Sequence, residues 1–168
     1  LDYGYKGVIL PNINENFILN EVIDGCLYPP LGKRGVGFSR SNLYGKNINH
    51  INSSKLLPLI IAQIENIKAL NNLEEICKNK FLSAIFIGPY DLSASIGKPG
   101  NFNDSEYLRV EKEIISISRK FSIPFGKHIT RPNIADLKKA INNGYQFLAY
   151  STDVYFLHSN SQNPIKND

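Results

Sequence analysis

Five short apolar runs, separated by polar or helix-forming stretches, constrain the fold of this 168-residue chain more than any other feature of its sequence. They lie at residues 7–10, 59–64, 84–87, 124–129 and 147–150. Short runs that are rich in Ile and bounded by turn residues are typical of buried parallel strands. We therefore expect five such strands, whose carboxyl ends meet at one edge.

Apolar residues at intervals of three and four predict amphipathic helices between these strands. The clearest stripes are Ile67, Leu70, Leu73 and Cys77; Tyr107, Val110, Ile114, Ile117 and Phe121; and Ile134, Leu137 and Ile141. Asn133 is a suitable N-terminal cap for the last helix, and Gly144 is a suitable stop. A shorter helical pattern covers residues 17–22 and is followed by a long loop. This alternation indicates an α/β fold with right-handed crossovers.

Two architectures fit this order, an open five-stranded sheet and a partial (β/α)₈ TIM barrel. A whole barrel takes about 250 residues, so this chain is shorter by roughly three βα units. The chain opens with Leu1-Asp2-Tyr3-Gly4 and enters a strand within a few residues. We therefore expect about the last five βα units of a barrel, without its N-terminal part. One domain is expected over 1–158, followed by a polar tail over 159–168.

Composition narrows the class of protein. A hydrophobic share of 42% and a charged share of 20% are those of a soluble globular domain. No leader and no membrane-spanning stretch is recognisable, and two cysteines do not make a disulfide framework, so a cytoplasmic setting is expected. The net charge of +4 comes from scattered Lys and Arg residues, so nucleic-acid binding is not expected.

Two acids follow neighbouring strands of the predicted sheet. Glu65 follows the second strand and Asp91 follows the third, one strand–helix–strand step later. Side chains at the carboxyl ends of adjacent parallel strands meet at the mouth of a sheet or barrel, where α/β enzymes hold their ligands. Two carboxylates in that position suit a hard divalent cation. Gln63 precedes Glu65 by two residues and so faces the same side of the strand.

Five segments together resemble the HpcH/HpaI aldolase family, and most closely its 2-dehydro-3-deoxyglucarate aldolase branch. They are Leu1-Asp2-x-Gly4-x-x-Gly7-Val8-Ile9-x-Pro11, Tyr28-Pro29-Pro30-x-Gly32-x-Arg34-Gly35, Gln63-Ile64-Glu65, Gly88-Pro89-x-Asp91-Leu92-Ser93-x-Ser95-x-Gly97 and Gly144-Tyr145-x-Phe147. They occur in order and run in register from Leu1 to about Leu157.

The resemblance implies a metal-dependent class II aldolase of the phosphoenolpyruvate/pyruvate superfamily. Such an enzyme cleaves 2-dehydro-3-deoxy sugar acids to pyruvate, or a related 2-keto acid, and an aldehyde. A malyl-CoA-type or citrate lyase-like acyl-CoA lyase and a non-catalytic degenerate half-barrel are the alternatives. The relatives assemble as hexamers, so the resemblance also implies a homo-oligomer.

The resemblance assigns roles to individual residues. Glu65 and Asp91 match the ligands of Mg²⁺, with Mn²⁺ or Co²⁺ as alternatives. Gln63 matches a contact to the pyruvate end of the substrate. The backbone N–H groups of Tyr90 and Asp91 match those that hold the substrate carboxylate, although relatives usually carry a small residue where Tyr90 stands.

Two further residues belong to the matched motifs. Asp2 matches an acid that raises the basicity of the family's catalytic His. Arg34 is either a structural anchor or a contact to the aldehyde portion or a neighbouring subunit.

The sequence departs from the family at the proton-transfer step. The family's catalytic His and its enolate-stabilising Arg lie on earlier strands, and neither has a counterpart here. Of the three histidines, His50 lies in a polar loop and His158 near the tail, whereas His128 ends the fourth predicted strand. His128 alone is therefore placed to reach the mouth. We expect this chain alone to bind a divalent ion weakly and to show little or no aldolase activity.

Overall fold

A computed structural model describes residues 1–51 and 57–161 of the chain. Its five strands pair in chain order, and every pair is parallel. The strands are β1 (Gly7–Leu10), β2 (Leu59–Ile64), β3 (Leu82–Ile87), β4 (Phe125–Ile129) and β5 (Phe147–Tyr150). All five predicted strands are present, and β3 begins two residues before the predicted start at residue 84.

Helices follow the strands in alternation, as the apolar stripes predicted. They are α1 (Asn16–Cys26), α2 (Leu73–Cys77), α3 (Pro89–Ser95), α4 (Ser105–Lys120), α5 (Ile134–Asn142) and α6 (Asp153–Asn160), with 3₁₀ helices η1 (Arg40–Asn42), η2 (Ile48–His50) and η3 (Ile67–Asn72). The Asn133 side chain caps α5 by accepting from the N–H groups of Ala135 and Asp136. The predicted stripe from Ile67 to Cys77 forms η3 and then α2. Helix α6 was not predicted, and residues 162–168 of the predicted tail lie outside the described part.

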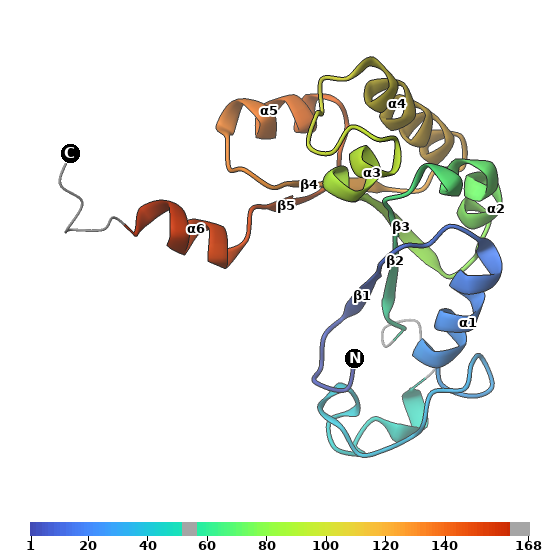
Figure 1. Ribbon diagram of the computed structural model, residues 1–168. Helices are drawn as coiled ribbons and strands as arrows, with labels where there is room; N and C mark the ends of the chain where they lie inside the picture. The colour runs from blue at the N-terminus through green and yellow to red at the C-terminus, as the bar shows by residue number, and fades with distance from the viewer. Residues whose placement is uncertain (52–56, 162–168) are drawn as a thin grey trace.

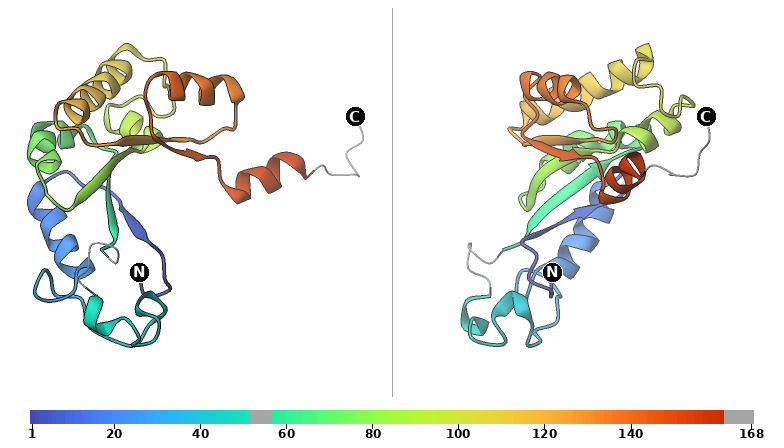
Figure 2. Two further views of the ribbon diagram at one scale, coloured as in Figure 1. Left: turned by 180° about the vertical axis from the view of Figure 1, so that it is seen from behind. Right: turned by 90° about the vertical axis from the view of Figure 1, so that its left-hand side faces the viewer.

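The sheet is curved rather than flat, and helices α1, α2, α4 and α5 lie along its convex side (Figure 1). This arrangement is a half-barrel, which decides between the two predicted architectures in favour of the partial barrel. Two further views show α6 extending away from the body after β5 (Figure 2). Within the described residues, no helix combines the length and the apolar character needed to cross a membrane.

The core lies between the convex side of the sheet and the helices. Ile60, Ala62 and Ile64 of β2 alternate along the strand and are 0% exposed. On the concave side, by contrast, Ile9 is 41% and Leu59 54% exposed. Strand side chains alternate between the two sides, so the half-barrel has one packed side and one open side.

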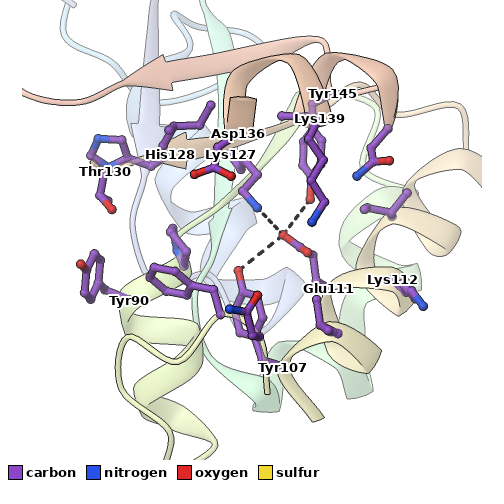
Figure 3. A pocket seen from close by; sticks show the side chains of 18 of the residues that line it. Tyr90, Tyr107, Glu111, Lys112, Lys127, His128, Thr130, Asp136, Lys139 and Tyr145 are labelled. Atoms are coloured by element: carbon purple, nitrogen blue, oxygen red, sulfur yellow. Dashed lines mark hydrogen bonds and ion pairs between the residues drawn. The ribbon is translucent and has the colours of Figure 1, made fainter. Parts of the chain in front are cut away.

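A largely buried polar cluster joins α4 to β4 and to Tyr145, which precedes β5, on the convex side (Figure 3). One carboxylate oxygen of Glu111, Oε1, accepts hydrogen bonds from Lys127 Nζ at 2.6 Å, Tyr145 Oη at 2.9 Å and Tyr107 Oη at 3.4 Å. Burial raises the pKa of both tyrosines, and the nearby Glu111 carboxylate raises it further. These phenols therefore stay protonated and act as donors. The cluster lines a cavity of about 1230 Å³.

Candidate metal and keto-acid site

The carboxyl ends of β1, β2 and β3 surround a hollow of about 350 Å³. It is lined by Asn12, Glu65, Asn66, Asp91 and Ser95. Glu65 directly follows β2, and Asp91 lies in the first turn of α3, which follows β3. The two acids that the sequence singled out thus line the same hollow.

Two donors fix the Glu65 carboxylate. Its Oε1 accepts the backbone N–H of Asn12 at 2.8 Å, and its Oε2 accepts from Gln63 Nε2 at 2.5 Å. The contact to Gln63 agrees with the expectation that both side chains share one side of β2. Each carboxylate oxygen keeps a further lone pair, because a carboxylate offers about four acceptor positions. Glu65 is therefore oriented and still able to bind a cation.

Gly88 has no side chain, and the side chains of Gln63 and Glu65 occupy the space beside it. A Cβ atom at Gly88 would be 2.8 Å from both Gln63 Nε2 and Glu65 Oε2, and 2.9 Å from the Cβ of Glu65. Real Cβ atoms essentially never approach a neighbour this closely, so a side chain at position 88 would displace the Glu65 carboxylate. No role at the site was predicted for Gly88 or for Asn12. The signal was present, because each follows a predicted strand at its carboxyl end.

The residues present fit a magnesium-type ion. Mg²⁺ is bound in proteins by one or two carboxylates, and water and substrate complete its octahedron. In the described part of the chain, no hydrogen bond or ion pair engages the Asp91 carboxylate. No group of three or more His, Cys, Asp or Glu side chains gathers there either. The hollow offers two carboxylates, which is a Mg²⁺ set rather than a zinc set.

Helix α3 begins beside this hollow. Pro89 occupies its first turn, and the capping residue Gly88 makes no side-chain hydrogen bond. The first N–H groups of a helix have no partner within the helix, and those of Tyr90 and Asp91 are of this kind. The Tyr90 ring is 41% exposed and packs edge-on against Phe102, with 5.1 Å between the ring centroids. It lines the larger cavity rather than the hollow.

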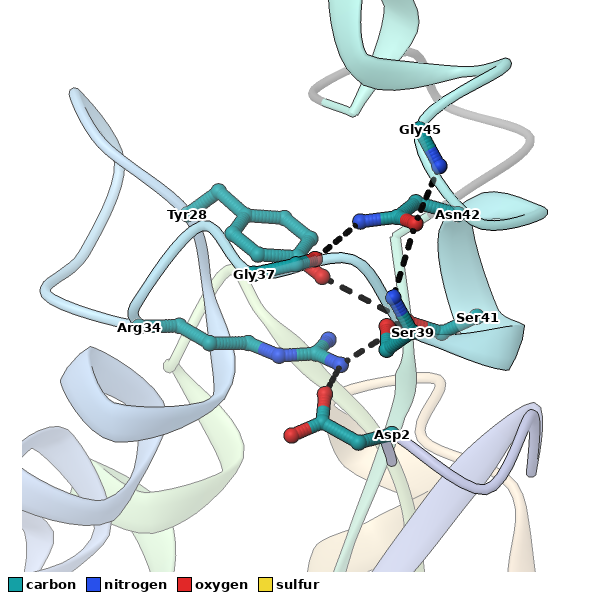
Figure 4. Close-up of polar contacts among 8 residues, drawn as sticks. All are labelled: Asp2, Tyr28, Arg34, Gly37, Ser39, Ser41, Asn42 and Gly45. Atoms are coloured by element: carbon teal, nitrogen blue, oxygen red, sulfur yellow. Dashed lines mark hydrogen bonds and ion pairs between the residues drawn. The ribbon is translucent and has the colours of Figure 1, made fainter.

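Arg34 and Asp2 are paired with each other (Figure 4), and neither lines the hollow. The Arg34 guanidinium also donates to Ser41 Oγ at 3.1 Å and lies 4.4 Å from the centroid of the Tyr28 ring. This hydrogen bond from Arg34 lowers the pKa of the Asp2 carboxyl. The side chain of Arg34 is only 10% exposed, and its contact to Asp2 links the loop after α1 to the N-terminal segment.

The three histidines lie far apart in the fold. His50 is exposed at the end of η2, and His158 is exposed on α6. His128 lies on β4, and its Nε2 is 3.2 Å from the carbonyl oxygen of Ser151. His128 also lines the larger cavity.

The chain is a parallel α/β half-barrel with two acids at the ends of its strands. These features are typical of α/β-barrel proteins, which bind their ligands at the carboxyl ends of the strands. The family model described as HpcH/HpaI aldolase/citrate lyase matches residues 1–159. The chain belongs to this family.

Two curated relatives are sugar-acid aldolases. A 5-keto-4-deoxy-D-glucarate aldolase of Klebsiella pneumoniae is 29% identical over 96% of this chain and 63% of its own length. A 2-keto-3-deoxy-L-rhamnonate aldolase of Salmonella dublin is 32% identical over 91% of this chain and 57% of its own length. The chain therefore spans about three fifths of these relatives.

Solved structures share the fold. An HpcH/HpaI aldolase/citrate lyase family protein from Burkholderia cenocepacia superposes with a TM-score of 0.85 at 21% identity, over 94% of this chain and 63% of that chain. A citrate lyase beta subunit from M. tuberculosis, complexed with oxaloacetate and magnesium, superposes with a TM-score of 0.57 at 14% identity, over 88% of this chain and 56% of that chain. The half-barrel thus superposes on about three fifths of each of these two chains.

Proposed function

We propose that this chain carries the metal-binding and keto-acid-binding part of a class II aldolase that cleaves 2-keto-3-deoxy sugar acids. The observation that carries the proposal is the convergence of Glu65 and Asp91 on one hollow, with Gln63 bonded to Glu65. The two curated relatives, at 29% and 32% identity, support a sugar-acid substrate over an acyl-CoA thioester.

Different residues of the site would bind the metal ion and the substrate. Glu65 and Asp91 would hold Mg²⁺, and the ion would supply Lewis-acid stabilisation of negative charge on a keto oxygen. Gln63 gives one amide hydrogen to Glu65, and its second amide hydrogen and its carbonyl oxygen remain for the pyruvate end. The N–H groups of Tyr90 and Asp91 would receive the substrate carboxylate at the start of α3.

Exposed apolar residues and free cysteines bear on the oligomeric state and the cellular compartment of the protein. Val154 and Leu157 on α6 are 69% and 73% exposed, so this helix has an apolar surface that another copy of the chain would cover. A homo-oligomer is therefore part of the proposal. Cys26 and Cys77 are free thiols, which suits a reducing cytoplasm.

Replacing Glu65 with Gln, or Asp91 with Asn, should weaken Mg²⁺ or Mn²⁺ binding by at least about tenfold, because each change removes one of two anionic ligands. Isothermal titration calorimetry of the purified chain measures the effect. Glu15→Gln is the matched control, since Glu15 is exposed and makes no capping hydrogen bond. Wild-type affinity in both site variants, or an equal loss in the control, would exclude the metal site.

The 168-residue chain alone should bind the ion weakly and produce little or no pyruvate from a 2-keto-3-deoxy sugar acid. The physical reason is that the sequence offers no counterpart to the family's proton-accepting His or its enolate-stabilising Arg. Pyruvate release coupled to lactate dehydrogenase provides the measurement. Turnover at the rate of a complete family aldolase, measured in parallel, would refute this prediction.

A further inference from the structure

His128 lies in the same row of the sheet as Glu65, on the concave side. Ile64 pairs with Ile87, and Ile87 pairs with Lys127, so the next residues in register are Glu65, Gly88 and His128. Lys127 contacts Glu111 on the convex side, and neighbouring residues of a strand face opposite sides. The side chain of His128 therefore faces the concave side, as that of Glu65 does.

Gly88, which lies between these two residues in the row, has no side chain. Neighbouring strands are about 4.8 Å apart, so the backbones at positions 65 and 128 are separated by about 10 Å. This span suits a short acid whose keto group is held near Glu65 and whose far end reaches β4.

The hydrogen bond of His128 determines what its ring can offer. The Ser151 carbonyl oxygen can only accept, so Nε2, at 3.2 Å, carries the hydrogen. In the neutral imidazole Nδ1 is then an acceptor. Such a nitrogen pairs with a hydroxyl group, whereas an apolar chain would leave it without a partner.

The surroundings of His128 suit a hydroxylated chain. Thr130 comes two residues after His128, so it faces the same side of the strand, and it carries a hydroxyl group. In Figure 3 these residues lie at one side of the cavity, and the cluster around Glu111 lies at the other. The polar groups near β4 are thus separate from the buried Glu111–Lys127 pair.

We propose that His128 determines substrate specificity by accepting a hydrogen bond from a hydroxyl group on the aldehyde portion, beyond the bond that is cleaved. This inference rests on the proposed function and adds a residue that would recognise the hydroxylated part of its substrate. It gives His128 no part in proton transfer.

The test compares two acids that differ only in that hydroxyl, 4,5-dihydroxy-2-oxopentanoate and 4-hydroxy-2-oxopentanoate, with pyruvate as the third probe. Calorimetric titration in MgCl₂ should show about fivefold tighter binding of the dihydroxy acid, the effect of one hydrogen bond. His128→Leu should reduce this preference to less than twofold and leave pyruvate affinity within twofold of wild type. His128→Asn, which keeps an acceptor, should retain part of the preference. His158→Leu, a change at an exposed histidine on α6, should behave as wild type.

The outcomes separate the two proposals. A fivefold preference that persists in His128→Leu, or is absent from the wild type although pyruvate binds, overturns the role of His128 and leaves the proposed function standing. An equal loss of pyruvate binding in His128→Leu also overturns it, because the effect would then be general. Failure of pyruvate to bind to the wild-type chain with Mg²⁺ overturns the proposed function and this inference with it.

Discussion

Replacing Lys127 with Met is expected to lower the free energy of unfolding by about 3 kcal/mol, because it leaves the Glu111 carboxylate buried without its cation. The side chains of Lys127 and Glu111 are only 22% and 14% exposed. The remaining donors, Tyr107 and Tyr145, are neutral phenols and do not compensate a full charge. Chemical denaturation followed by circular dichroism measures the change.

The matched control for this prediction is Lys112→Met, on the same helix as Glu111. Lys112 is exposed, so its replacement should change the unfolding free energy by less than about 0.5 kcal/mol. Equal unfolding free energies for the two variants would show that the buried pair contributes nothing to stability. A double variant, Lys127→Met with Glu111→Leu, should recover part of the loss, since it removes the unpaired charge.

Replacing Gly88 with Ala is expected to reduce Mg²⁺ affinity by about tenfold or more while the chain stays folded. The added Cβ would meet Glu65 Oε2 and Gln63 Nε2 at 2.8 Å, so the carboxylate must move from its position between Asn12 and Gln63. The loss of one positioned ligand accounts for the magnitude. Calorimetric titration gives the affinity, and thermal melting reports the fold.

Gly35→Ala provides the comparison, because a Cβ at Gly35 would meet nothing within 4 Å. It should bind the ion as the wild type does. If Gly88→Ala also bound the ion with wild-type affinity, the position of Glu65 would not depend on the space that Gly88 leaves. Circular dichroism would show whether Gly88→Ala is folded. Gly88→Ser is not a useful alternative variant, because serine adds the same Cβ.

Most of the fold could be predicted from local patterns. The Ile-rich run at β2 and the stripe along α4 each have one buried side, so apolar spacing identified both. Helix α6 escaped prediction because it projects from the body, and its apolar residues do not form a stripe against a core. The predicted stripe from Ile67 to Cys77 became η3 and α2, since spacing alone does not distinguish a 3₁₀ turn from an α-helical one.

The candidate site was predictable only in part. Glu65 and Asp91 were recognisable because each follows a strand, and parallel strands bring their carboxyl ends together. The backbone donor at Asn12 was not, because it lies 53 residues from Glu65 and meets it only through the pairing of β1 with β2. The pairing of Arg34 with Asp2, 32 residues apart, likewise depends on how the long loop returns to the N-terminal segment.

The sequence by itself determined the parallel α/β class, the five strands and the two acids at strand ends, because these depend on periodicity and on residue order. Only the tertiary structure decided that the sheet curves into a half-barrel and that Gly88 leaves room for the Glu65 carboxylate. It alone placed His128 in the row of Glu65. The reason is physical: curvature, close approach and register arise between strands, and no single segment encodes them.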